Sequence, residues 1–308
     1  MAERRHPLPD GPLNRREFLK AAALAPLAAA APFAAVGTAP LRAAQERDSE
    51  KKEEGRDKPA PSPYAPFNMS IQSYSLRNFG FEKMVETLFS LDIRFVELFP
   101  GHFPADSGEN EMRSRRRVMR HNSVKPISYG VVGFTKDHEK NRALFEFAKT
   151  LGLASISADP QPDSFDSLDK LVEEFKIPIA IHNHGPEDRR YRTPEMIEKA
   201  IQSHHKLIGL CVDTGHFLRV DVNPVEVVKK FKERVYGVHV KDVKSAAGKK
   251  TFTVTGEGDL DTVGLLKGLK ESGFKGGLSL EYEEEPDNPV PSIQKCLAAV
   301  RDAVKKLA

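Results

Sequence analysis

Eight short runs of β-type residues recur along this chain at a spacing of roughly 25–30 residues. Helical patterns separate most of these runs; Leu144, Phe147, Ala148 and Leu151, for example, repeat at the i, i+3, i+4 and i+7 positions of an amphipathic helix. Strands that alternate with helices form a parallel sheet, and eight repeats close most naturally into an α/β fold of the (β/α)8 type, the TIM barrel. The runs cover residues 69–74, 95–98, 124–129, 154–158, 178–182, 208–213, 235–239 and 277–281.

A doubly wound open sheet is the alternative arrangement, but no GxGxxG motif follows the first run. The boundaries of several helices can also be predicted. Thr193 and Asn223 each precede a proline, which is the pattern of a capping side chain before proline at the first helical position. Gly273 predicts the end of a helix that begins near Asp261.

The first 44 residues resemble a twin-arginine export signal. Arg15 and Arg16 precede Phe18, Leu19 and Lys20, and an uncharged, alanine-rich stretch follows over residues 21–41. Three prolines within that stretch argue against a membrane-spanning helix, because each removes a backbone donor that lipid cannot replace. We therefore predict a signal peptide over residues 1–44, the twin-arginine machinery as a partner, and export to the periplasm or beyond. A disordered basic leader and an uncleaved anchor are the alternatives.

The next segment, residues 45–66, is charged, rich in proline and nearly free of large apolar side chains. Such a composition cannot bury a core, so we predict a disordered linker. The remaining residues, 67–308, are sufficient for one large domain.

Charge argues against a nucleic-acid partner. Residues 1–44 carry six Lys/Arg and three Asp/Glu, which accounts for the whole net charge of +3. The rest of the chain is therefore neutral, whereas proteins that hold phosphate backbones usually show a basic excess. We interpret the arginine-rich run at 113–120 as the solvated face of a helix, with an anion site as the alternative.

The two cysteines, Cys211 and Cys296, both lie in apolar patterns. We expect both to be buried free thiols. An exported protein without a disulfide framework must be stabilised by its core.

Polar residues gather where the predicted strands end. In a barrel of this kind, chemistry belongs at the carboxyl ends of the strands, which meet around one mouth. The strand ends carry Glu97, Tyr129, His182, Asp213, His239 and Glu281, and His102, His184, His216, Lys241 and Asp242 follow just beyond them.

Four of these residues form a candidate metal site: His182, Asp213, His239 and Glu281, from the fifth to the eighth strands. Neutral imidazole and carboxylate oxygen together suit manganese, zinc, iron or cobalt. A single histidine at a strand end is more often a hydrogen-bonded structural residue. Four consecutive strand ends with ligand-type residues favour a metal instead.

Several segments, in this order and spacing, resemble the sugar phosphate isomerase/epimerase family, which has the xylose-isomerase-like TIM barrel. The resemblance covers residues 69–308 and implies one divalent ion, manganese foremost and zinc, cobalt, iron or magnesium as alternatives. It assigns the ligands to the four residues just named. One departure stands out, because the sugar epimerases carry a glutamate where this chain has His182. The segments are VELFPGHFP, IHNHG, CVDTGH, VHVKD, GEGDLD and GGLSLEYE.

The resemblance implies a metal-dependent isomerase or epimerase that acts on a keto-sugar or polyol ketone through an enediolate. Glu281 is the candidate base, and His182 stands where the second catalytic carboxylate of the epimerases would be. The candidates for binding the carbohydrate substrate, or for supplying an acid, are Glu97, His102, His184, His216 and Lys241. Because phosphosugars are mostly retained in the cytosol, predicted export favours an unphosphorylated substrate.

Other functions remain open at this level. Because His182 replaces a carboxylate, the two-base epimerase mechanism is weakened, and a lyase or dehydratase for keto-sugars, which needs one base and an acid, is the alternative. An apurinic-site endonuclease of the endonuclease IV type shares the barrel but needs more metal ligands. A non-catalytic sugar-binding protein is the third rival. Many relatives pair through their barrel helices, which is compatible with a homo-oligomer.

Overall fold

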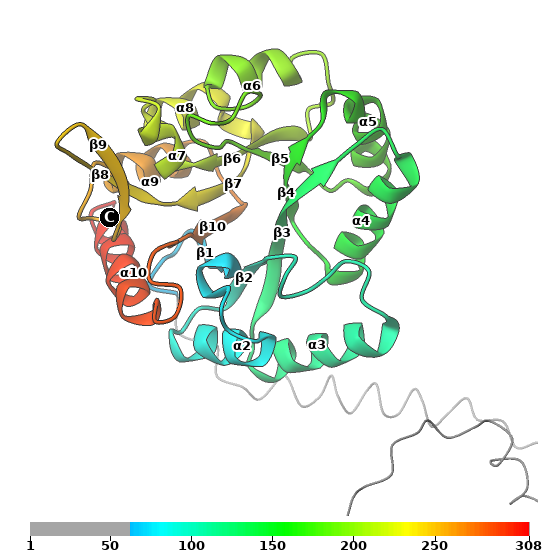
Figure 1. Cartoon of the computed structure of the whole chain (residues 1–308), viewed down its shortest axis with the longest axis horizontal. Helices are drawn as coiled ribbons and strands as arrows, with labels where there is room; N and C mark the ends of the chain where they lie inside the picture. Colours follow the sequence, from blue (N-terminus) through cyan, green and yellow to red (C-terminus); the bar gives the residue numbers. More distant parts are fainter. Residues whose placement is uncertain (1–61, 308) are drawn as a thin grey trace, which may run out of the picture. The chain divides into compact units, whose positions relative to one another are not determined.

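The computed structural model describes residues 62–307. Eight parallel strands close into a barrel in the order β1-β10-β7-β6-β5-β4-β3-β2, which confirms the predicted fold. Figure 1 looks into this ring of strands, with the helices around its outside. The barrel strands are β1 (Asn68–Gln72), β2 (Phe95–Leu98), β3 (Lys125–Phe134), β4 (Ser155–Pro160), β5 (Ile179–His182), β6 (Ile208–Asp213), β7 (Val235–Val240) and β10 (Gly277–Leu280).

Closure of the barrel depends on β1, which pairs with β10 on one side and with β2 on the other. The strand pairs are all parallel, so every barrel strand ends at the same mouth. Strands β5, β6 and β10 are buried at every residue, and β1, β2, β4 and β7 at every residue but one. The reason is that side chains on one face fill the barrel and those on the other face pack against helices.

The helices lie mainly between consecutive strands, as the sequence pattern predicts. They are α2 (Phe81–Ser90), α3 (Glu109–His121), α4 (His138–Leu151), α5 (Phe165–Phe175), α6 (Pro194–Ile201), α7 (Thr214–Arg219), α8 (Pro224–Phe231), α9 (Thr262–Glu271) and α10 (Val290–Lys305), with 3-10 turns η1 (Ser73–Leu76), η2 (Pro162–Ser164) and η3 (Lys232–Arg234).

The predicted helix boundaries are confirmed. The Thr193 side chain accepts a hydrogen bond from the Met196 amide at the start of α6, and Asn223 caps α8 in the same way. Asp261 caps α9, and Gly273 follows the end of that helix with a φ of +71°. A left-handed backbone at this position favours glycine, which explains the stop signal in the sequence.

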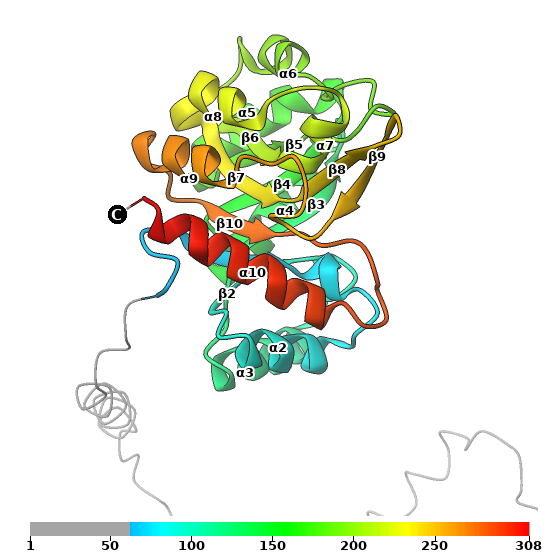
Figure 2. The same cartoon turned by 90° about the vertical axis from the view of Figure 1, so that its left-hand side faces the viewer.

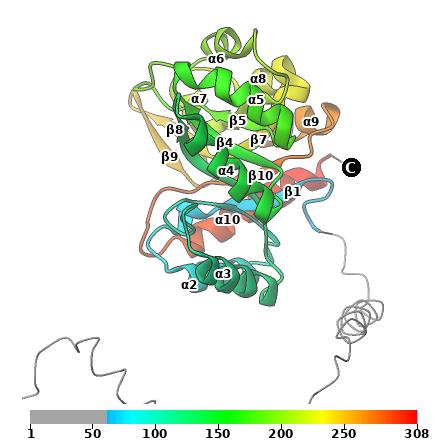
Figure 3. The same ribbon diagram turned by 90° about the vertical axis from the view of Figure 1, so that its right-hand side faces the viewer.

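An antiparallel hairpin was not predicted. Strands β8 (Asp242–Ala246) and β9 (Lys249–Thr253) follow β7 directly and project beyond the barrel strands in Figures 2 and 3. The turn of the hairpin consists of two residues, Ala247 and Gly248, both with positive φ. Asn-Gly and Asp-Gly are the usual sequence signals of such a turn, so Ala-Gly between two polar strands did not indicate a hairpin.

One predicted strand end was wrong. Strand β3 continues to Phe134, so Tyr129 lies within the strand rather than at its exit. The Tyr129 ring packs against Phe147 of α4, with ring centroids 4.9 Å apart, and therefore belongs to the layer between strands and helices.

The edges of the domain and its thiols can also be compared with the predictions. The predicted signal peptide (1–44) and the predicted linker up to residue 61 lie outside the described residues. Tyr64, within the last residues of the predicted linker, is already buried in the core.

The two cysteines are as expected, because Cys211 and Cys296 are both free and buried. Within residues 62–307, none of the helices has the length and apolar character needed to cross a bilayer.

Candidate metal centre

The four predicted ligands come together at the barrel mouth. One nitrogen or oxygen atom from each of His182, Asp213, His239 and Glu281 lies within 4.8 Å of the others, and all four residues are buried. His182 and Asp213 end β5 and β6, His239 lies in β7, and Glu281 follows β10. Because these strands are neighbours in the barrel, their ends supply four side chains to one point.

The atoms that face one another in this cluster are mainly hydrogen-bond acceptors. His239 Nδ1 lies 3.0 Å from His182 Nε2 and 3.1 Å from Glu281 Oε2. Asp213 Oδ2 lies 3.3 Å from His182 Nε2 and 3.8 Å from His239 Nδ1. Lone pairs directed at a common point repel one another unless a cation lies between them.

The partner of His239 on its other side determines which nitrogen faces the cluster. His239 Nε2 lies 3.0 Å from Glu97 Oε1. An ionised carboxylate can only accept a hydrogen bond, so Nε2 must carry a proton. In neutral His239 the lone pair is then on Nδ1, which is directed at the other three ligands. This tautomer is the one that binding through Nδ1 requires.

One buried atom of the cluster has no polar partner: His182 Nδ1 makes no hydrogen bond to residues 62–307. Asp213 Oδ2 accepts no well-aligned hydrogen bond, but the Lys241 ammonium lies 3.0 Å from it and His182 Nε2 lies 3.3 Å from it. Two imidazoles and two carboxylates that converge within 4.8 Å are a donor set that fits one divalent metal ion.

The electrostatics of the cluster agree with this. Burial by itself lowers the pKa of His239, but Cys211, Glu97 and Glu281 raise it well above its usual range. The site thus attracts positive charge at Nδ1, which either a second proton or a metal ion would supply. Burial raises the pKa of Glu97, but the charge and hydrogen bond of His239 outweigh it and bring the pKa down to about 2.

Lys241 bridges three carboxylates beside the cluster. Its Nζ lies 3.0 Å from Asp213 Oδ2 and 2.7 Å from Glu281 Oε2, and it also contacts Glu283. Burial lowers the pKa of Lys241, but the three carboxylates raise it above its usual range. The side chain is therefore a fixed cation and not a free base.

A cavity of about 350 Å³ opens above the cluster. It falls within the size range of small-molecule sites. His184 and His216 both border it, with ring centroids 4.6 Å and 5.8 Å from that of His182. The full lining consists of Gln72, Tyr74, Phe99, Gly130, Val131, His182, His184, His216, Lys241, Glu281 and Glu283.

The His216 side chain has a defined setting at the cavity wall. Its amide donates to Asp213 Oδ1 at 2.7 Å, because Asp213 caps α7. Burial lowers the pKa of the His216 imidazole to about 3, so the ring is neutral near pH 7.

Two residues predicted to bind substrate do not line this cavity. Glu97 is only 1% exposed and lies below the cluster, where it contacts His239. His102 is also buried; its Nδ1 lies 2.9 Å from Ser73 Oγ and its Nε2 lies 3.0 Å from the Phe79 carbonyl oxygen. With both ring nitrogens engaged, His102 holds the chain after β1 and β2 in place.

Sequence reasoning missed several residues of the site. Glu283 follows Glu281 by two residues, so an i, i+2 rule for extended chain could have identified it. Gln72, Tyr74 and Phe99 also line the cavity, and none of them is a carboxylate, a histidine or a lysine, the residue types that indicated the site. Phe252 of the hairpin reaches the same region, with its ring 5.5 Å from that of His216.

Asp242 holds the loop that follows the hairpin. Its carboxylate accepts hydrogen bonds of 2.8–3.2 Å from the amides of Val243, Gly256, Gly258 and Leu260. The amides of Gly256, Gly258 and Leu260 belong to the glycine-containing segment GEGDLD, whose backbone donors would otherwise be free to bind an anion. The carboxylate already satisfies them, so the segment is a tightly held connection.

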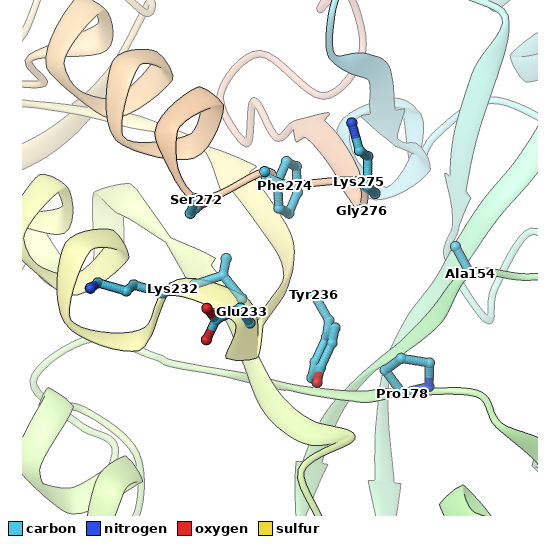
Figure 4. Close-up of a pocket in the computed structure, with 11 residues that line it drawn as sticks. Ala154, Pro178, Lys232, Glu233, Tyr236, Ser272, Phe274, Lys275 and Gly276 are labelled. Atoms are coloured by element: carbon cyan, nitrogen blue, oxygen red, sulfur yellow. The ribbon is translucent and has the colours of Figure 1, made fainter.

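A second cavity, of about 330 Å³, lies at the opposite end of the barrel (Figure 4). Three residues of its lining directly precede barrel strands: Ala154 precedes β4, Pro178 precedes β5 and Gly276 precedes β10. This cavity is therefore at the amino ends of the strands. Glu233 is its single carboxylate. Chemistry in barrels of this type belongs at the other end, so we assign the site to the first cavity.

Comparisons with known proteins agree with the fold. An inosose dehydratase of Clostridium botulinum (strain Eklund 17B / Type B) is 30% identical over 143 residues, or 41% of this chain and 47% of that protein. The rhizopine catabolism protein MocC of Rhizobium meliloti is 27% identical over 139 residues, 40% of this chain and 42% of that protein. The chain thus matches about half the length of these curated relatives.

Solved structures share the fold at lower identity. The IOLI protein with a bound zinc atom has a TM-score of 0.62 and 19% identity, over 77% of this chain and 98% of its own. A D-tagatose 3-epimerase-like protein has a TM-score of 0.61 and 17% identity, over 78% and 99%. A family model described as the xylose isomerase-like TIM barrel matches residues 85–303. This chain therefore belongs to the xylose isomerase-like TIM-barrel family.

Proposed function

We propose that this protein is a divalent-metal-dependent enzyme that removes a proton beside the carbonyl of a keto-sugar or polyol ketone. The observation that carries the proposal is the convergence of His182, Asp213, His239 and Glu281 beside a cavity that two of them, His182 and Glu281, line. The relatives named as inosose dehydratase and D-tagatose 3-epimerase-like support a substrate of this class.

The four ligands would hold the ion, with manganese as our first candidate and the zinc in the IOLI protein as support for the alternative. When bound, a divalent ion supplies a Lewis acid that stabilises negative charge developing on the carbonyl oxygen of the substrate. The other parts of the reaction fall to the residues around the cavity.

Glu281 is our candidate for the base. Its burial raises the pKa, but Lys241 and His239 more than compensate and hold it below its usual range. The carboxylate is therefore ionised near pH 7, which is the state that a base requires. Lys241 stays protonated beside it and adds a fixed positive charge. His184, which borders the cavity, is the candidate for a proton donor, whereas the neutral His216 ring can supply only a hydrogen bond.

Elimination is the outcome that the arrangement favours over epimerisation. Epimerisation needs bases on opposite faces of the substrate, yet Glu281 and Glu283 come from the same segment and share Lys241. His182 offers its Nε2 to the ligand cluster, so this nitrogen is not free to act as the second base, whereas the Glu281 carboxylate has a second oxygen besides the one that faces the cluster. A lyase of the dehydratase type needs only one base and one acid. An isomerase that reuses one base on one face is the second candidate.

The location proposed for this activity is outside the cytoplasm. The twin-arginine pattern at residues 15–20 supports export, and export would bring the enzyme to unphosphorylated substrates. The cluster of ligand-type residues is explained better by a metal-dependent enzyme than by nucleic-acid repair or by passive sugar binding. Only one group of potential metal ligands is present within the described part of the chain, whereas the endonuclease needs three ions.

The test is proton NMR in heavy water with manganese and a set of inososes, free keto-sugars and keto-glycosides. Loss of water or of an aglycone supports the lyase, and deuterium uptake without loss of mass supports the isomerase. Failure of every substrate to exchange deuterium or change, with metal bound, would contradict the proposal.

A further inference from the structure

Glu97 has an unusual position for a charged residue. It lies in β2, is 1% exposed and is absent from the cavity lining. Its carboxylate nevertheless has three partners. Oε1 faces His239 Nε2 at 3.0 Å, and Oε2 accepts hydrogen bonds from Ser128 Oγ at 2.9 Å and from Ser279 Oγ at 2.8 Å.

The serines extend this network across the barrel. Ser279 gives its only hydroxyl proton to Glu97, so in the 2.8 Å contact with Ser70 it must be the acceptor. Ser70, Ser128 and Ser279 come from β1, β3 and β10, which means that three strands fix one carboxylate. Barrel interiors are usually filled with branched apolar side chains, so a polar layer here needs a reason.

A structural role alone does not provide that reason. Burial of a carboxylate costs free energy that its hydrogen bonds only partly offset, and well-packed apolar residues at the same place would often give an equally stable fold. Stability alone therefore does not explain the polar layer, whereas the layer is well suited to hold a carboxylate at one point below His239.

We propose that Glu97 is a positioning residue that orients His239 for metal binding; the proposal rests on the metal site described above. The carboxylate accepts the Nε2 proton and keeps the Nδ1 lone pair directed at His182, Asp213 and Glu281. Without Glu97, the ring could rotate or change tautomer and direct a proton at the ion. Partners of this kind outside the ligand set orient metal-binding histidines and increase their basicity.

Metal binding by the whole chain, measured without substrate, tests this directly. We expect Glu97→Gln to weaken Mn²⁺ binding by roughly 10- to 100-fold, because the amide keeps an acceptor but loses the charge. Glu97→Ala should weaken binding more. The visible spectrum of bound Co²⁺ should also change in Glu97→Gln, since this spectrum reports the geometry of the ligands.

The matched control is Asn141→Ala. Asn141 is a buried residue of α4 that hydrogen-bonds Thr135 and Ser167 and is not part of the cluster. This variant should lose stability but keep the Mn²⁺ affinity and the Co²⁺ spectrum. If Glu97→Gln behaves like Asn141→Ala, with lower stability and unchanged metal binding, Glu97 is a structural residue and the proposal is wrong.

A milder variant covers the case in which Glu97→Gln does not fold. Ser128→Ala removes one hydrogen bond to Glu97 and leaves the carboxylate in place. It should weaken Mn²⁺ binding by a smaller factor in the same direction, and unchanged affinity would overturn the proposal. Because no substrate is used, failure to find an activity would not affect this result. A wild-type protein that binds no metal would contradict both proposals.

Discussion

His182 Nε2 lies 3.0 Å from His239 Nδ1, so two imidazole nitrogens face each other at hydrogen-bonding distance in a buried site. The other nitrogen of His239 is committed to Glu97, and the other nitrogen of His182 has no hydrogen-bond partner in the described structure. One proton between the two rings satisfies only part of this arrangement. A divalent ion would bind both of the facing nitrogens, His182 Nε2 and His239 Nδ1, and the two carboxylates as well.

Removal of metal should therefore destabilise the protein. We expect a lower melting temperature after chelation with EDTA and recovery when Mn²⁺ is added. At a free concentration 100 times the dissociation constant, binding to the folded state alone contributes about 2.7 kcal/mol. Scanning calorimetry with and without metal measures this, and Asp213→Ala, which removes a ligand, should show no recovery. Equal melting temperatures for the two wild-type samples would contradict the assignment.

Substitution of Glu281, the candidate base, should reduce activity far more than substitution of Glu283, the other glutamate of the cavity. Glu281→Gln should lower kcat by roughly 10²- to 10⁴-fold, the usual contribution of a general base, and should also weaken metal binding. Glu283→Gln is the matched control, because Glu283 contacts the same lysine but is outside the ligand cluster. It should keep its metal and most of its activity. A similar loss of activity in Glu281→Gln and Glu283→Gln would contradict the assignment of Glu281 as the base.

Loss of Lys241 should be costly for stability. Lys241→Met leaves Asp213, Glu281 and Glu283 without the cation that lies among them, and breaking a buried ion pair in this way costs roughly 3–5 kcal/mol. Urea unfolding of metal-free protein measures the change in the free energy of unfolding. Lys244→Met, on the exposed part of the hairpin, should change little. An equal effect of the two substitutions would show that the carboxylates tolerate one another.

Acid should destabilise the fold partly through His102. Burial lowers the pKa of His102 in the folded protein, whereas in the unfolded chain an imidazole titrates near pH 6.5. Below that pH the unfolded state binds the proton more tightly, so stability is fully present above about pH 6.5 and declines as the pH falls toward the folded pKa. The decrease in melting temperature from pH 7 to pH 5 should be smaller in His102→Gln than in the wild type. Identical falls would exclude a contribution from His102.

The fold and the cluster of four ligands could be predicted from local sequence. The spacing of strands and helices predicts a parallel barrel, and a parallel barrel brings every strand exit to one mouth. His182, Asp213, His239 and Glu281 are all at such exits, so their convergence follows from the topology. Even the capping by Thr193 and Asn223 is decided by residues adjacent in the chain.

Only the tertiary structure decided how deep each side chain lies and which atoms it meets. Glu97 and His102 also lie at or just after the end of a strand, but one lies below the cluster and the other holds a loop. The reason is that residues from other segments of the chain occupy their polar atoms: His239 and Ser279 those of Glu97, and Ser73 and Phe79 those of His102. The shared Lys241 and the Phe252 hairpin depend in the same way on segments that meet only after folding. Periodicity determines the face of an element on which a residue lies, whereas its contacts depend on long-range packing that no local pattern records.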